Sequence, residues 1–474
     1  MRLGERTRFS FLIIMFGSTA SVDNPLVSDA IPPAQQRISS PNSSVKSSAF
    51  DTERGEQNEI KIKANSSRRQ TLWFFSAFLI GFVLSTIIFA SLHWATAKDL
   101  VQSSGPASSN GGGLAAFAAN WTEDTNISIP AYGGDLAGTI CLPQNVATTG
   151  FAVIIAGSGP VDRNGNVVTS NLYTNTYQML ARQLAMLGIA TLRYDKRGVG
   201  GSASLVTKEN KKDYLFSNIT DDATAVAKYL LDMKMSMSMS MSMSVSLRVT
   251  TKKWTKASGC VWLIGHSEGS TVAEVVAAQD TLKKNSSDKM ICGIVTDAGP
   301  GQNVTVVLKR QFVSLPEPCR SMFYGALDSW AVKTYLTAAS MKAIKVSCKN
   351  NFAVTDILDN QNYMVSWSQQ DPVSLMKTIA TNTDPIKPVL IVQGENDFNV
   401  QELDAQLLHQ ANPRASSVLL VAGMTHDQKF CPVSWQTNPQ ECNKINFDPT
   451  SPIVPIVPST IQSFITFSDD SLLQ

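Results

Sequence analysis

The feature that most constrains this chain is a glycine-flanked serine at the end of an apolar run. Residues 261–269 read VWLIGHSEG, and a helix-forming segment rich in Ala and Val follows at residues 270–279. A strand, a tight turn and a helix in this order are the setting in which G-x-S-x-G raises a serine above the end of a sheet. Gly265 and Gly269 lack Cβ atoms, so strand and helix can approach closely around Ser267. The pattern predicts a nucleophilic serine, against the alternative of an ordinary glycine-rich βα turn.

Short apolar runs alternate with helical patterns after about residue 120. Strands that alternate with helices form a mostly parallel sheet with helices on both faces, so the pattern predicts an α/β fold. Active sites of such sheets lie at the carboxyl ends of the strands. The expected strands are residues 136–142, 152–155, 190–194, 260–264, 291–296, 389–393 and 417–421, and the expected helices include 177–187, 220–231 and 458–467.

A serine nucleophile needs a base, and histidine is the usual one. The chain has four histidines. His93 lies beside a long apolar segment, His266 lies inside the glycine–serine pattern and is expected to face away from the hydroxyl, and His409 lies in a helical pattern. His426 follows the last expected strand, where a loop can carry it back to Ser267. Elimination therefore predicts His426 as the base.

The histidine in turn needs a carboxylate that fixes its tautomer. Asp397 follows the strand expected at residues 389–393 and precedes His426. The order serine, aspartate, histidine along the chain is that of α/β-hydrolases. Asp297, just past the strand that follows the serine, is the alternative. We expect Asp397 to be the acid, because the end of its strand is the usual position.

Two backbone N–H groups are needed where negative charge develops during acyl transfer. The first is expected from Glu268, the residue after the nucleophile. The second is expected from Ser158, in the glycine-rich loop after residues 152–155. A phosphate-binding loop is rejected there, because the G-K-[ST] ending is missing and no helix follows at once. The seven cysteines form no C-x-x-C pair, so no metal site is expected, and the sequence predicts no cofactor.

Five short motifs of the domain, taken together and in order, are typical of one group of proteins. In chain order they are LAGT at residues 136–139, GSGPVDRNGN at 157–166, RYDKRGVG at 193–200, GHSEG at 265–269 and QGEND at 393–397. With them, the domain from about residue 120 to 467 resembles the serine-aminopeptidase-like (S33-type) esterases of the α/β-hydrolase superfamily. The resemblance implies an α/β-hydrolase fold with a helical cap, and Ser267, Asp397 and His426 as a catalytic triad. It implies no particular substrate, since such proteins include esterases, thioesterases and peptidase-like members.

Three segments add detail to this domain, which is expected to span residues 120–474. Residues 195–198 read DKRG, and we interpret them as a charged turn that braces a loop near the site. The cap is expected at about residues 302–383, where aromatic side chains would pack its core and line an apolar acyl pocket. Residues 235–244 are a Met-Ser repeat, which predicts a low-complexity loop.

The residues before the domain predict a membrane anchor. Residues 72–92 carry no charge, and a helix of about 20 residues crosses the hydrocarbon core. Residues 1–71 are expected to form a disordered tail, and residues 93–119 a stalk rich in Ser and Gly. We therefore expect a single transmembrane helix, with membrane lipid as its partner.

The charges around this span favour one orientation. Basic residues precede it at Arg54, Lys61, Lys63, Arg68 and Arg69, whereas Lys98 alone follows it before Arg163. The positive-inside rule then places the N-terminus in the cytosol and the hydrolase domain in the lumen or outside the cell. Residues 1–20 also look like a weak signal peptide, and their cleavage would place the domain in the cytosol instead.

Cysteines and glycosylation sequons agree with the luminal orientation. In an oxidising compartment, Cys319 could pair with Cys348 in the cap, and Cys431 with Cys442 after His426. Sequons that would face the lumen occur at Asn120, Asn126, Asn218, Asn285 and Asn303.

The sequence thus predicts a serine hydrolase that cleaves a small-molecule carboxylic ester through an acyl-enzyme. Peptide cleavage, thioester cleavage and acyl transfer to another acceptor are alternatives on the same three residues. A membrane-anchored binding protein without catalysis is the alternative of another class, and the complete triad argues against it. The net charge of +2 gives no indication of a nucleic-acid partner, and the oligomeric state is not indicated.

Overall fold

The computed structural model describes residues 120–207, 209–243, 259–283, 285, 289–381 and 387–471. Four predicted segments lie outside these residues: the possible signal peptide at 1–20, the tail, the transmembrane span at 72–92 and the stalk. Among the helices of the described part, none combines the length and the hydropathy that crossing a membrane requires.

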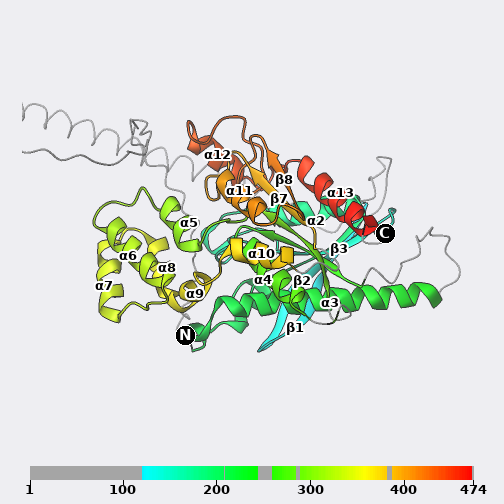
Figure 1. The fold of residues 1–474 in the computed structure, drawn as a ribbon, viewed down its shortest axis with the longest axis horizontal. Coiled ribbons are helices and arrows are strands. Elements are labelled where there is room, and N and C mark those ends of the chain that lie inside the picture. The colour runs from blue at the N-terminus through cyan, green and yellow to red at the C-terminus, as the bar shows by residue number, and fades with distance from the viewer. Residues whose placement is uncertain are drawn as a thin grey trace, which may run out of the picture. The chain divides into compact units, whose positions relative to one another are not determined.

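An eight-stranded sheet forms the centre of the domain, in the order β1-β2-β4-β3-β5-β6-β7-β8 (Figure 1). The first three strands in this order are antiparallel neighbours, and from β4 to β8 all neighbours are parallel. The mostly parallel sheet predicted from the alternating pattern is confirmed. The strands are β1 (Trp121–Ala131), β2 (Gly134–Pro143), β3 (Gly150–Ile155), β4 (Ile189–Tyr194), β5 (Val261–His266), β6 (Ile291–Asp297), β7 (Val389–Gly394) and β8 (Ser416–Val421).

The sheet explains which strands the sequence revealed. Strands β3 to β7 are buried along their whole length, as parallel strands covered on both faces are, so each appears as an apolar run. Strand β1 lies at the edge and is mostly exposed, and its polar sequence WTEDTNISIPA contains no such run. It was not predicted.

Helices cover both faces of the sheet. On one face α2 (Thr176–Met186) packs with α13 (Ile456–Ser471). The other face carries α3 (Phe216–Met243), α4 (Glu268–Thr281), α10 (Pro372–Thr381) and α11 (Glu402–Ala411). Neighbouring residues of β5 point to opposite faces: Trp262 belongs to the core under α2 and α13, and Leu263 to the core under α4.

Five helices between β6 and α10 gather at one end of the domain in Figure 1, and we call them the cap. The predicted disulfide Cys319–Cys348 joins α6 to the end of α7. Helix α10 lies within the segment expected as cap, but it packs against α4 and α11 beside the sheet. The cap helices are α5 (Val304–Gln311), α6 (Cys319–Ala331), α7 (Ala338–Ser347), α8 (Phe352–Asp359) and α9 (Gln361–Trp367). A further helix, α12 (Pro439–Asn446), follows β8.

The loop predicted for the Met-Ser repeat is wrong for residues 235–243. Helix α3 runs without a break to Met243, and its earlier turns pack against β1, β3 and α4. Extending an existing helix avoids the cost of nucleation, and Met is a good helix former. The low complexity of the repeat indicates that its side chains are not selected for packing in a core. A helix can still extend through it, because its residues have adequate helix propensity.

Candidate active site

Ser267 lies at the turn between β5 and α4, with φ of 54° and ψ of −121°. Residues with a Cβ hold such a positive φ only where the surrounding structure enforces it. Here the N–H of Ser267 donates to the carbonyl of Asp297 at 2.9 Å. A Cβ at Gly265 would lie 2.2 Å from the carbonyl oxygen of Gly269, and one at Gly269 would lie 2.3 Å from that of Ile155. The predicted close approach around both glycines is confirmed.

Asp397 and His426 come together from the ends of β7 and β8. His426 Nδ1 lies 2.8 Å from Asp397 Oδ2. The other carboxylate oxygen, Oδ1, accepts from the N–H groups of Asn399 at 2.8 Å and Val400 at 3.0 Å, which holds the carboxylate in place. An ionised carboxylate can only accept, so the proton of a neutral His426 sits on Nδ1 and Nε2 is left as an acceptor.

Burial and nearby charges shift the pKa of His426 in opposite directions. Burial lowers its pKa, but the charge of Asp397 and its hydrogen bond, with the further charges of Asp427 and Asp297, raise it to about 9. An imidazole in this environment is protonated at neutral pH and becomes a base as the pH rises.

Ser267 and His426 line one cavity of about 470 Å³. This volume lies within the roughly 300–1,000 Å³ typical of small-molecule sites. The apolar part of its wall comes from the cap, from the segment after β3, from the residue after Asp397 and from the segment after His426. It includes Val161, Val167, Leu172, Leu308, Phe312, Ile357, Phe398, Trp435 and Phe447. Of the aromatics of the cap, Phe323, Trp330, Tyr363 and Trp367 pack the core, as expected for part of the set.

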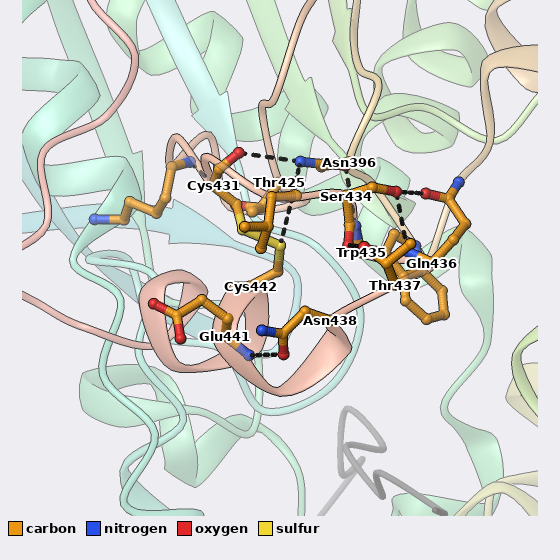
Figure 2. The surroundings of a disulfide bond; sticks show 12 residues. Asn396, Thr425, Cys431, Ser434, Trp435, Gln436, Thr437, Asn438, Glu441 and Cys442 are labelled. Atoms are coloured by element: carbon orange, nitrogen blue, oxygen red, sulfur yellow. Dashed lines mark hydrogen bonds between the residues drawn. A yellow bond between two sulfur atoms is a disulfide. The ribbon is translucent and has the colours of Figure 1, made fainter. Parts of the chain in front are cut away.

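A disulfide ties down the segment that follows His426. Cys431 and Cys442 pair as predicted and join this segment to α12 (Figure 2). The amide of Asn396 donates to the carbonyl of Cys431 at 3.1 Å and accepts from the N–H of Trp435 at 3.2 Å. The turn after β7 therefore holds the cavity wall as well as the adjoining aspartate. This role of Asn396 was not predicted, because its partners lie 35 and 39 residues away along the chain.

His266 does not face away from the site, and that expectation is wrong. Its ring lies 4.7 Å from the ring of His426, centre to centre, and it lines the same cavity. Burial, and then the proximity of His426, lowers its pKa to about 4, so the ring is neutral. Its Nε2 donates to the carbonyl of His426 at 2.9 Å, and its Nδ1 accepts from the Tyr177 hydroxyl at 2.8 Å. That hydroxyl accepts from the N–H of Gly157 at 2.9 Å.

Asp297, the alternative acid, is buried at the end of β6. Its Oδ2 accepts from the side-chain amide of Gln428, and its Oδ1 has no hydrogen-bond partner among the described residues. Burial raises its pKa to about 7, although the Gln428 hydrogen bond and His426 lower it. The carboxylate that bonds His426 is thus that of Asp397, and Asp297 acts on the imidazole through its charge.

The loop that carries Ser158 and the first turn of α4, which carries Glu268, are joined by a buried lysine. Lys196 Nζ lies 3.0 Å from a carboxylate oxygen of Glu268 and donates to the carbonyl of Gly157 at 2.5 Å. The hydroxyl of Tyr363, on α9, donates to the other carboxylate oxygen of Glu268. The interpretation of residues 195–198 as a brace is confirmed. The partners of Lys196 were not predicted.

Among the described residues, no group of three or more His, Cys, Asp or Glu side chains is placed to hold a metal ion.

No family model and no curated protein sequence matches the chain. Among solved structures, an esterase of Pyrococcus furiosus is similar at 14% identity and a TM-score of 0.40, over 76% of this chain and 96% of that one. The esterase Est1E of Butyrivibrio proteoclasticus is similar at 15% identity and a TM-score of 0.40, over 73% and 99%. A hyperthermophilic esterase of Pyrobaculum calidifontis is similar at 16% and 0.40, over 73% and 85%.

At these TM-scores the likeness carries no argument about activity. The fold follows from the chain's own geometry: the mixed eight-stranded sheet, the helices on both faces, and a serine at positive φ between β5 and α4. By these features the chain has the α/β-hydrolase fold.

Proposed function

We propose that this chain is a serine hydrolase that cleaves carboxylic esters through an acyl-enzyme. The observation that carries the proposal is the single cavity lined by both Ser267 and His426, with Nδ1 of the imidazole hydrogen-bonded to Asp397. A serine, a base and a group that orients the base form the arrangement that activates a hydroxyl as a nucleophile.

In the proposed reaction, Ser267 Oγ attacks the ester carbonyl and His426 Nε2 takes its proton. Asp397 stabilises the imidazolium, and the N–H groups of Ser158 and Glu268 hold the oxyanion. The tetrahedral intermediate then breaks its bond to the alcohol, which leaves with the proton from His426. Water repeats both steps on the acyl-enzyme and releases the acid and the serine.

We further propose that the domain works on the luminal or extracellular side of a membrane, anchored by residues 72–92. Three disulfides within the described residues support an oxidising compartment. Two of them were predicted, and the third, Cys260–Cys292, joins the residue before β5 to β6. The anchor itself and the side of the membrane remain predictions from the sequence.

A fluorophosphonate probe, which reacts with activated serines, tests the proposal. We expect the wild-type chain to be labelled and Ser267→Ala not to be. Ser270→Ala is the control, because Ser270 is a buried serine in the first turn of α4, three residues after Ser267, and its hydroxyl donates to the carbonyl of Gly265. Labelling that survives in Ser267→Ala would show that another serine reacts.

Substrate class is tested on the same proteins with a panel of carboxylic esters of increasing acyl length, beside a thioester and a peptide. We expect turnover of esters that is lost in Ser267→Ala. Labelling together with turnover of only the thioester or the peptide would keep the nucleophile and overturn the ester assignment.

A further inference from the structure

The peptide between Gly157 and Ser158 is held at its carbonyl by Lys196. Lys196 Nζ donates to the carbonyl oxygen of Gly157 at 2.5 Å. This peptide is trans, and the C=O and N–H of a trans peptide point in opposite directions. A lysine that binds the carbonyl therefore turns the N–H of Ser158 away from itself.

Ser158 lies between two cavities. It lines both the catalytic cavity and a smaller one of about 50 Å³, whereas Lys196 and Glu268 line only the smaller one. The loop also lies against the nucleophile, since a Cβ on Gly157 would come within 3.2 Å of the Cβ of Ser267. Lys196 and Ser267 therefore line different cavities, and the loop that carries Ser158 contacts both residues.

The same lysine is tied to the second expected donor. Its ion-pair partner, Glu268, directly follows Ser267 and begins α4, so its backbone N–H belongs to the nucleophile turn. Lys196 and Glu268 are 6% and 2% exposed, so neither can swing out to solvent without breaking the pair. Lys196 therefore links the loop that carries Ser158, through the Gly157 carbonyl, to Glu268, the second N–H donor.

The side chain of Tyr363 connects the cap to this ion pair. The hydroxyl of Tyr363 donates to the Glu268 oxygen that does not face Lys196, and its ring stacks on Tyr214 at 5.1 Å. Helix α9 is thereby connected to the nucleophile turn, 95 residues away along the chain.

We propose that Lys196 is a positioning residue which, through Glu268, sets the N–H groups of Ser158 and Glu268 at the distance the oxyanion requires. Tyr363 extends this control to the cap. This inference rests on the proposed serine hydrolase function. Lys196 does not touch the substrate, so its effect falls on the tetrahedral state, where the two N–H groups act, and not on substrate binding.

The test compares two variants. Lys196→Met removes the clamp but leaves the carboxylate of Glu268 buried without its partner, which is strongly destabilising. The double variant Lys196→Met with Glu268→Gln removes both charges together and keeps an acceptor for the Tyr363 hydroxyl, so it decides the question if the single variant does not fold. Both keep every backbone N–H.

Lys387→Met is the matched control. Lys387 is 3% exposed, pairs with the buried Asp280 at 2.8 Å and donates to the carbonyl of Ile291 at 2.6 Å. It reproduces the clamp of Lys196 at the amino end of β7, the opposite end of the sheet from Ser267. Its loss should lower the melting temperature and leave kcat within about twofold.

The measurements are kcat and KM on an ester and the affinity of a trifluoromethyl ketone, which forms a tetrahedral oxyanion adduct with serine. In the double variant we expect kcat and ketone affinity to fall together by about 10- to 100-fold, with KM changed less than about threefold. A folded double variant that keeps wild-type kcat and ketone affinity would overturn the inference. A rise in KM alone would also overturn it, since Lys196 would then serve binding.

A different result would overturn the proposed function itself. If the wild-type chain neither binds the ketone through Ser267 nor turns over the ester, the hydrolase proposal falls, and this inference with it. If the wild type does both and the double variant does so equally well, only the positioning role falls.

Discussion

Two buried carboxylates act on His426, and they differ in how they act. Asp397 is hydrogen-bonded to the imidazole at 2.8 Å. Asp297 accepts a hydrogen bond from Gln428 instead, and burial raises its pKa to about 7. Asp397→Asn should lower kcat by about 10⁴-fold, because the amide favours the wrong tautomer of His426. Asp297→Asn should cost much less in kcat/KM on the same ester. If Asp297→Asn is the more damaging change, the acid lies after β6.

The pH dependence follows from the pKa of His426. Burial lowers this pKa, but Asp397 and the other carboxylates raise it to about 9, and only the neutral imidazole can take a proton from serine. We therefore expect kcat/KM to rise with pH toward a midpoint near this value. Removing the negative charge of Asp297 lowers the pKa of His426, so Asp297→Asn should shift the midpoint to lower pH. A midpoint unchanged in the variant would show that Asp297 carries no charge there.

At the scale of elements, α4 contains a buried acid without a hydrogen-bond partner. Both carboxylate oxygens of Glu274 are unsatisfied among the described residues, and burial, with the charge of Asp371, raises its pKa well above 4.5. Above the unfolded pKa, the unfolded chain releases this proton while the folded chain keeps it, so folding loses stability as pH rises. Glu274→Gln is neutral at every pH and should remove that loss.

Thermal melts at two pH values check this prediction. Glu274→Gln should melt higher than the wild type by about 2–4 °C at roughly pH 8, and the gain should vanish near roughly pH 4. A gain of equal size at both pH values would instead point to better packing of the amide.

The elements themselves were predictable where their signal is local. Strands β3 to β7 are apolar runs, and the turn at Ser267 needs two glycines within five residues. The edge strand β1 has no apolar run, and the helical Met-Ser segment continues from residues that pack elsewhere. The strand β1 depends on its pairing with β2, whereas the repeat takes its conformation from the helix that precedes it along the chain.

At the scale of the whole molecule, the five sequons of the domain are not equivalent. Asn120 and Asn126 are exposed at the start of β1. Asn303 caps α5 through its side-chain oxygen, and its amide donates to the carbonyl of Ser368 at 2.6 Å. If the domain is luminal, we expect glycans at Asn120 and Asn126 and none at Asn303.

Digestion with an N-glycosidase, in a chain whose tail sequons Asn42 and Asn65 have been removed, should increase gel mobility. Asn303→Gln should leave the shift unchanged, and a protease added to sealed microsomes should spare the domain. No shift, together with loss of the domain to the protease, would place it in the cytosol and identify residues 1–20 as a cleaved signal peptide.

The sequence by itself determined the strand–turn–helix at Ser267, the mostly parallel sheet, and the positions of Asp397 and His426 after their strands. These features depend on residues that are neighbours along the chain. Only the tertiary structure decided that His266 turns toward His426, and that Lys196 meets Glu268 across 72 residues and Tyr363 meets it across 95. Such contacts have no local signature, because the direction of a side chain is decided by the packing of segments that only folding brings together.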